Sequence, residues 1–437
     1  MLELNERQTA KFIKQKIEEV LREFNIALDQ VLRVTCDNGA NMLAAVRELD
    51  KYVQVISAEK LMLDDEDDNY EDNDELLNDI INELSTKVSL VRCAVHTLQL
   101  AVTDVVNHTD NRIRRITTVA KNCRKTAYKP SFDLKNIPLP PLFSKTRWGG
   151  IYEMILKFHD NEEFYRDLGK QFKELDLSEH WDYIHDYKNA LQPVYVSTKE
   201  MQAKHMSVGD FYINWLRCMM EVKQQPMNEL AKSLATSLQT RLQQLQQNLP
   251  FKAALLVDPR FNYISSSVLT SEEKEETSKF IIATSERIKS LIPTKSPQTS
   301  TTTEQNTSSS YLDDFMTRFF GGSPPSTSQT SSGNSFVKQV NALDLETHQN
   351  YKYDTWKHWT DRKDSHPELS EVAFTIMTVP ATQVSVERAF SALALVLSPA
   401  RTKLSAQNLA NILLVKLNEE LVHEIVPNMY DWKELSK

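Results

Sequence analysis

VPATQVSVERAFSALALVLSPARTKLSAQNLANILLVKLN, residues 379–418, is the stretch on which the interpretation of the fold depends. Its first half predicts an amphipathic helix over Thr382–Leu397, because apolar residues recur there at three- and four-residue spacing and make one face. Pro380 and Thr382 stand at its start as a breaker and a cap, and Pro399 stops it. The apolar face consists of Val386, Ala389, Phe390, Leu393, Val396 and Leu397.

The second half predicts another amphipathic helix, from Ser405 to Leu417. Ser405 is a typical N-cap residue, and Leu404 and Leu409 are spaced to close a hydrophobic staple around it. Its apolar face runs through Leu409, Ile412, Leu413 and Leu417. Two helices this apolar need a partner to cover them, and the alternatives are the core of their own chain and a second molecule.

The wording of this stretch resembles the C-terminal signature of hAT superfamily transposases. In that family a Ser-x-Glu-Arg-x-Phe-Ser block precedes an Arg-x-x-Leu-Ser-x-x-x-Leu block, and this chain carries both in the same order. The resemblance implies a ribonuclease-H-like catalytic domain that this region closes, and a homodimer held by the same two helices. The dimerisation residues that it implies are Phe390, Leu393, Leu409, Ile412, Leu413 and Leu417.

Two carboxylates gain a catalytic interpretation from the resemblance. By spacing alone, Glu387 is a surface carboxylate paired with Arg388, whereas the family places its catalytic glutamate there. Asp37 follows a strand predicted for Val31–Thr35 and precedes a helix, which is where open α/β sheets bind ligands. The alternative is that Asp37 shapes the turn at Gly39. The block TCDNGANM resembles the one that holds the family's second catalytic aspartate, which corresponds to Asp37.

Bulk properties exclude several classes of protein. The net charge of −9 is matched by the nine carboxylates of Asp64–Glu75, so the rest of the chain is electrically balanced. The four cysteines are widely scattered, which is not a disulfide framework and fits a reducing compartment. No apolar run is long enough to span a bilayer, and the sequence predicts no membrane partner. Glycine is scarce, with 8 residues in 437, which argues against a Gly-rich phosphate loop and favours a mostly helical chain.

Cys93 and His96 follow a strand predicted for Val88–Cys93 and have the spacing of half a zinc site. No second Cys or His pair stands at a suitable distance, so the sequence does not predict zinc there. The family carries a similar Cys-x-x-His, and the resemblance implies a structural or site-supporting role.

A basic segment and an Arg-Trp pair give two candidates for nucleic-acid contact. Seven Arg and Lys residues of the helix predicted over Arg112–Lys129 lie mostly off its apolar stripe, which indicates either a solvated face or a phosphate-contacting one. Arg147 and Trp148 either pack a domain boundary or, by the resemblance, contact DNA through a tryptophan that stacks on an unpaired base. The predicted nucleic-acid-binding residues are Arg114, Arg115, Arg124, Lys125, Arg147 and Trp148.

The chain divides into four predicted segments. Residues 1–150 form a partial ribonuclease-H-like core with a disordered acidic insertion at 64–75, because that run is too charged to pack. Residues 151–292 form an all-helical insertion, in which Asp258 caps a turn before Pro259. Residues 293–340 are a disordered Ser/Thr/Pro linker, and residues 341–437 complete the core and dimerise.

We therefore predict an α/β fold, mostly helical overall, with a ribonuclease-H-like core that a large helical insertion interrupts. The resemblance implies that Asp37 and Glu387 hold Mg²⁺ or Mn²⁺ if the protein cuts DNA. No strand bearing the family's first aspartate precedes Asp37, and the first strands and the zinc finger of the family are missing as well. We expect weak metal binding, no certain cofactor and no cleavage.

Three functions remain open. The first is a transposase-derived protein without catalysis that acts by dimerisation and by DNA association. The second is an amino-terminally truncated piece of an active cut-and-paste transposase, and the third is a helical scaffold with no nucleic-acid role. The resemblance implies a nuclear location, and the sequence otherwise fits the cytoplasm.

Overall fold

The structure is a computed structural model that describes residues 9–36, 42, 44–45, 49, 89–106, 110–142, 148–202, 206–291, 332–397 and 404–418. The chain falls into two compact units. Unit 1 contains Met1–Asn248 and Val379–Lys437, and unit 2 contains Leu249–Thr378. The predicted acidic insertion at 64–75 lies outside the described residues.

Unit 1 contains a two-stranded parallel sheet of β1 (Arg33–Cys36) and β2 (Ser89–Arg92). The register pairs Arg33 with Ser89 and Cys36 with Arg92. Both strands fall where the β-branched runs predicted them, within two residues. The backbone amide of Cys93 donates to the Cys36 carbonyl at 2.9 Å, and the chain then enters α4 (Ala94–Thr103). The predicted passage from strand to helix is therefore confirmed.

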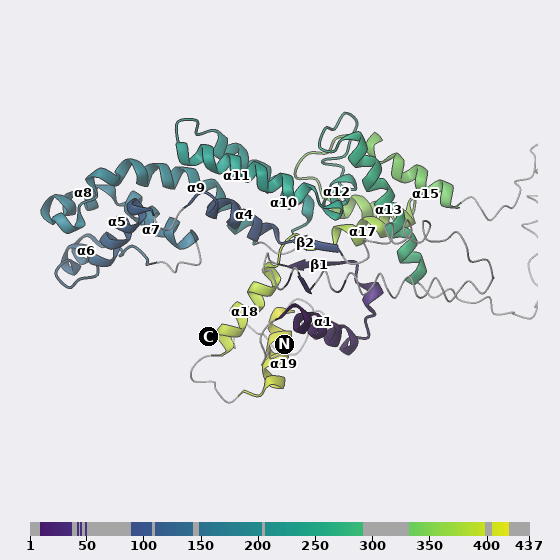
Figure 1. The fold of residues 1–437 in the computed structure, drawn as a ribbon, viewed down its shortest axis with the longest axis horizontal. Helices are drawn as coiled ribbons and strands as arrows, with labels where there is room; N and C mark the ends of the chain where they lie inside the picture. The colour runs from purple at the N-terminus through teal and green to yellow at the C-terminus, as the bar shows by residue number, and fades with distance from the viewer. Residues whose placement is uncertain are drawn as a thin grey trace, which may run out of the picture. The chain divides into compact units, whose positions relative to one another are not determined.

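The other regular elements in the described part of unit 1 are helices (Figure 1). Its further helices before unit 2 are α1 (Ala10–Glu23), α5 (Asn111–Asn122), α6 (Lys129–Lys135), α7 (Trp148–Asp160), α8 (Glu162–Gln171), α9 (Trp181–Met201), α10 (Val208–Lys223) and α11 (Glu229–Gln246). The helix α9 packs against α7, α10 and α11, and α11 also packs against α4. Their shared core buries Phe158, Tyr187, Phe211, Trp215 and Leu238 completely. A mostly helical chain was the prediction, and it is confirmed.

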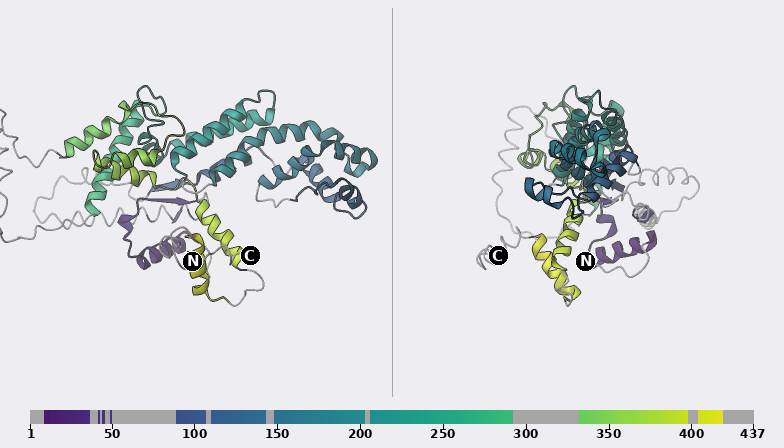
Figure 2. Two further views of the ribbon diagram at one scale, coloured as in Figure 1. Left: turned by 180° about the vertical axis from the view of Figure 1, so that it is seen from behind. Right: turned by 90° about the vertical axis from the view of Figure 1, so that its left-hand side faces the viewer.

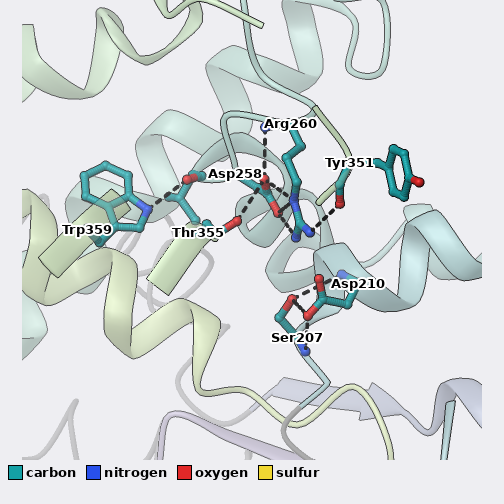
Figure 3. A network of polar contacts seen from close by, with 8 residues as sticks. Ser207, Asp210, Asp258, Arg260, Tyr351, Thr355 and Trp359 are labelled. Carbon is teal, nitrogen blue, oxygen red and sulfur yellow. Dashed lines mark hydrogen bonds and ion pairs between the residues drawn. The ribbon is translucent and has the colours of Figure 1, made fainter. Parts of the chain in front are cut away.

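Unit 2 consists of helices around a buried polar network. Its helices are α12 (Leu249–Leu256), α13 (Ser271–Leu291), α15 (Ser332–Asn341), α16 (Thr355–Asp361) and α17 (Pro367–Met377). Asp258 forms a bidentate ion pair with Arg260 and accepts the Arg260 backbone amide at 3.0 Å (Figure 3). Trp359 donates from its indole to the Val257 carbonyl at 3.0 Å. Asp258 thus caps its turn, as predicted.

The predicted linker ends earlier than expected. Residues 332–341 form α15, in which Phe336 and Val340 are buried. The linker was predicted from its composition, and the Ser and Gly residues at the start of α15 extended that prediction too far. Phe336 and Val340, at i, i+4 spacing, are the apolar signal of the helix there. Residues 293–331 lie outside the described residues. The other predicted segment boundaries remain predictions.

The last two described helices are α18 (Val384–Val396) and α19 (Ala406–Leu417), which pack against each other in unit 1 (Figures 1 and 2). Both helices and the cap of the second were predicted, and the Ser405 hydroxyl accepts the Asn408 amide at 3.2 Å. Thr382 is not the cap of the first, because Gln383 occupies that position without a capping hydrogen bond from its side chain. No helix in the described part of the chain has the length and apolarity needed to cross a membrane.

Candidate functional site

The segment just before α18 is hydrogen-bonded to the carboxyl end of the parallel sheet. The Thr35 hydroxyl on β1 donates to the Pro380 carbonyl at 2.8 Å. The Ala94 backbone amide, at the start of α4, donates to the Ala381 carbonyl at 2.9 Å. The first bond joins residues 345 positions apart in the sequence and the second joins residues 287 positions apart, so the C-terminal region returns to the sheet and to the helix that follows it.

Gln383 makes two more contacts at the same place. Its side-chain amide donates to the Thr35 carbonyl at 3.0 Å, and its backbone amide donates to the Cys93 thiol at 3.3 Å. Gln383 is the residue directly before α18, so these bonds fix where that helix starts. Gln383 was not predicted as a functional residue, because it falls inside the helix predicted over Thr382–Leu397 and no local signal marks it.

Glu387 lies in the first turn of α18, close to the sheet end. Burial raises the pKa of the Cys93 thiol above its ordinary value, and the nearby negative charge of Glu387 acts in the same direction. Glu387 itself is exposed. Asp37, its predicted companion, follows the last residue of β1 but lies outside the described residues. The structure therefore brings Glu387 to the strand end that precedes Asp37.

Arg388 anchors α18 at a second point. Its guanidinium donates to the backbone carbonyl of Gln202, the residue that ends α9. Carbonyls at a helix C-terminus lack partners within the helix and carry its negative dipole end, so a cation is favoured there. Arg388 makes this contact rather than the predicted ion pair with Glu387.

The apolar residues of α18 separate into a buried and an exposed set. Val384, Ala392 and Val396 are buried within the chain. A second stripe, which we call the outer stripe, consists of Val386, Phe390, Leu393 and Leu397 at alternating four- and three-residue spacing. Phe390 is 59% exposed, and Val386 and Leu397 are 49% and 46% exposed. The sequence predicted one apolar face for this helix. The structure divides that face, because Val396 is buried while Val386, Phe390 and Leu397 are exposed.

The helix α19 has the same division. Leu413 was predicted as a dimerisation residue. In the structure it is 5% exposed and belongs to the interior, so a second molecule cannot reach its side chain. Leu409 is half-buried. Exposed apolar side chains cover much of the rest of the helix, and they are Ile412, Leu414, Val415 and Leu417. Large apolar residues exposed on two adjoining helices are typical of an interaction surface.

Comparison with known families assigns this region. Residues 333–418 match the model of the hAT family C-terminal dimerisation region. This part of the chain is therefore similar to the C-terminal dimerisation region of hAT family proteins. The match covers α15 through α19, so the exposed surface of α18 and α19 lies inside the hAT dimerisation region. Comparison with curated proteins found no match.

The arginines of α5 and of the turn that follows it are largely engaged within the chain. Arg115 donates to the carbonyls of Lys173 and Asp176, and Arg124 donates to those of Ala120 and Pro140. Two other predicted nucleic-acid-binding residues, Arg114 and Lys125, are exposed and make no side-chain hydrogen bond or ion pair within the described residues. Fewer basic side chains can therefore contact a phosphate than the sequence indicates.

Trp148 is packed inside the protein. Its side chain is 5% exposed and lies edge-on to Tyr152 and Tyr195, with ring centroids 6.5 and 6.3 Å away. Stacking on a base would require the indole to leave this cluster, so the structure favours the packing interpretation. Arg147 lies outside the described residues.

Few possible metal ligands lie among the described residues at the sheet end. No group of three or more His, Cys, Asp or Glu side chains within the described residues is arranged to hold a metal ion. Glu387 supplies a single carboxylate, which is fewer than a divalent cation such as Mg²⁺ needs from a protein site built of carboxylates. No metal-dependent step is derived from this arrangement.

Proposed function

We propose that this hAT protein works as a homodimer that assembles through the outer stripe of α18 and the exposed apolar residues of α19. One observation carries the proposal: Phe390, Leu397, Leu414 and Leu417 are between 43% and 65% exposed on two adjoining helices. A monomer would leave these side chains in water at a cost that a second copy removes.

The energy gained by covering these residues is of the same order as the cost of association. Covering a half-exposed Leu or Phe contributes roughly 1 kcal/mol, about half the value of full burial. In a two-fold interface each residue counts twice, so four covered residues contribute on the order of 8 kcal/mol. That lies within the roughly 4–15 kcal/mol lost when two molecules associate.

The experiment is a measurement of mass in solution. We expect a dimer by light scattering at tens of micromolar and a monomer for Phe390→Asp, with the same helical circular dichroism. Met227→Asp is the matched control, because Met227 is 92% exposed but lies between α10 and α11, outside the dimerisation region. A wild-type protein that is monomeric at this concentration contradicts the proposal.

We also propose that the β1–β2 sheet belongs to a ribonuclease-H-like core whose catalytic site no longer cuts DNA. The parallel pairing and the position of Glu387 at the carboxyl end of the strands support such a core. We expect no nicking of supercoiled DNA with Mg²⁺ or Mn²⁺. Metal-dependent nicking that Asp37→Asn abolishes would instead favour a piece of an active transposase.

DNA association and a nuclear location complete the proposal. The exposed Arg114 and Lys125 support a weak electrostatic contact with phosphates, in which affinity falls as salt rises. Binding that is absent at low salt would favour the helical scaffold with no nucleic-acid role. A fluorescent fusion of the full chain would show whether the protein enters the nucleus.

A further inference from the structure

The helix α18 is attached to the rest of unit 1 by polar contacts near its start. Gln383 holds the helix to the sheet through the Thr35 carbonyl and to α4 through the Cys93 thiol. Arg388 holds it to the end of α9 through the Gln202 carbonyl. These two residues are five positions apart, so both anchors act on the first one and a half turns.

The remainder of α18 extends beyond these anchors and packs against α19. Phe390 and Leu397, which carry the outer stripe, follow Arg388 in the chain and are exposed. A helix anchored near one end turns about that end when an anchor is lost. The direction in which the outer stripe faces therefore depends on residues that are not part of it.

We infer that Gln383 and Arg388 are positioning residues for self-association: they hold α18 and α19 in the one orientation in which two copies can pack. This inference rests on the proposed homodimer. Neither side chain is among the exposed apolar residues of the surface, and both are half-buried against other elements of the same chain. They act on the partner only through the orientation of α18.

The expected size of the effect follows from the population of the correct orientation. Apparent affinity falls by the fraction of molecules that hold the binding-competent conformation. Removing one hydrogen bond of ordinary net strength lowers that population, and we expect the dimer dissociation constant to rise about two- to ten-fold. A loss of both anchors should exceed either single loss.

The experiment compares four variants with the wild-type full chain by sedimentation equilibrium. Gln383→Met keeps the length of the side chain but has no side-chain N–H donor, so it loses the bond to the Thr35 carbonyl and keeps the backbone bond to Cys93. Arg388→Ala removes the second anchor. Arg388→Lys keeps a charged donor and should recover most of the affinity. Ser391→Ala is the matched control, because Ser391 is exposed on α18 and its hydroxyl makes no hydrogen bond within the described residues.

A second measurement reports the position of α18 without reference to the dimer. The Cys93 thiol is buried and accepts a hydrogen bond from the backbone amide of Gln383. The rate at which iodoacetamide alkylates Cys93, measured by mass spectrometry, therefore reports how often this contact opens. At a dilution where all variants are monomeric, Gln383→Met should be alkylated several-fold faster than wild type. Phe390→Asp should match wild type, because Phe390 is not part of the anchor.

The outcomes separate the two proposals. If Phe390→Asp leaves the dimer intact, the proposed homodimer surface is wrong and this inference falls with it. If Phe390→Asp dissociates the dimer while Gln383→Met and Arg388→Ala behave as Ser391→Ala does, the homodimer stands and the positioning role is overturned. Should Gln383→Met fail to fold, Arg388→Ala and its recovery in Arg388→Lys still decide the question.

Discussion

The helices α10 and α18 have similar apolar content and opposite environments. In α10, Phe211 and Trp215 are fully buried, with ring centroids 5.4 Å apart, because α9 and α11 pack on either side. In α18, Phe390 is likewise separated from the next apolar residues of its stripe by three or four positions, yet it is 59% exposed. Periodicity shows that a helix has an apolar face, but neighbouring elements decide whether that face is core or interface.

The largest effect is expected from a matched pair of phenylalanines. Phe211→Ala should lower the free energy of unfolding by about 3–5 kcal/mol, because it leaves a cavity in a closed core. Phe390→Ala should change the stability of the monomer by less than about 0.5 kcal/mol, since its ring is mostly in water already. Urea denaturation at a dilution that favours monomers measures both. Equal losses would mean that α18 is as much part of a core as α10.

The second prediction compares an exposed and a buried apolar residue of the α18–α19 pair by their effects on self-association. Phe390→Asp should weaken self-association at least about ten-fold, because it places a charge inside an apolar contact. Leu413→Asp should instead unfold the α18–α19 pair, since Leu413 is 5% exposed and its replacement buries a carboxylate within the chain. Light scattering and circular dichroism together distinguish dissociation from loss of helix. If Leu413→Asp only dissociated the dimer, its side chain would belong to the interface after all.

Much of this organisation could be predicted from the sequence, and the failures have a common cause. The β-branched runs located β1 and β2, and Ser405 located the start of α19, because these signals act within a few residues. The division of the α18 face could not be predicted, since it depends on which elements return from elsewhere in the chain. Gln383 escaped for the same reason, because both its partners are about 290 or more residues away.

The candidate site shows the same limit. The resemblance to hAT transposases identified Glu387, and the structure places it at the end of the sheet, where its charge acts on Cys93. Trp148 was assigned to nucleic acid by the resemblance, and Arg115 by its position off the apolar stripe of a basic helix. Their environments are an aromatic cluster and two main-chain carbonyls, which local sequence does not reveal.

A third prediction concerns the basic residues that remain free to meet DNA. The double variant Arg114→Glu and Lys125→Glu should weaken binding to any duplex several-fold and reduce the slope of affinity against salt concentration. Arg124→Gln is the contrasting change, because Arg124 already donates to the Ala120 and Pro140 carbonyls. Fluorescence anisotropy across a salt series measures the slope. A larger effect from Arg124→Gln than from the double variant would place the contact elsewhere on α5.

The smallest effect is expected where the sequence offers no apolar face at all. The run Asp64–Glu75 contains nine carboxylates and no aliphatic side chain, so it cannot bury apolar surface as α10 does or offer it to a partner as α18 does. Replacing it with a Gly/Ser segment of equal length should leave the thermal midpoint within a few degrees, by scanning calorimetry. The replacement also removes nine negative charges, so a small rise in DNA affinity at low salt is the expected companion effect. A fall of ten degrees or more would show that the run contacts the folded protein, and the basic face of α5 is the first place to look for its partner, because that helix carries opposite charge.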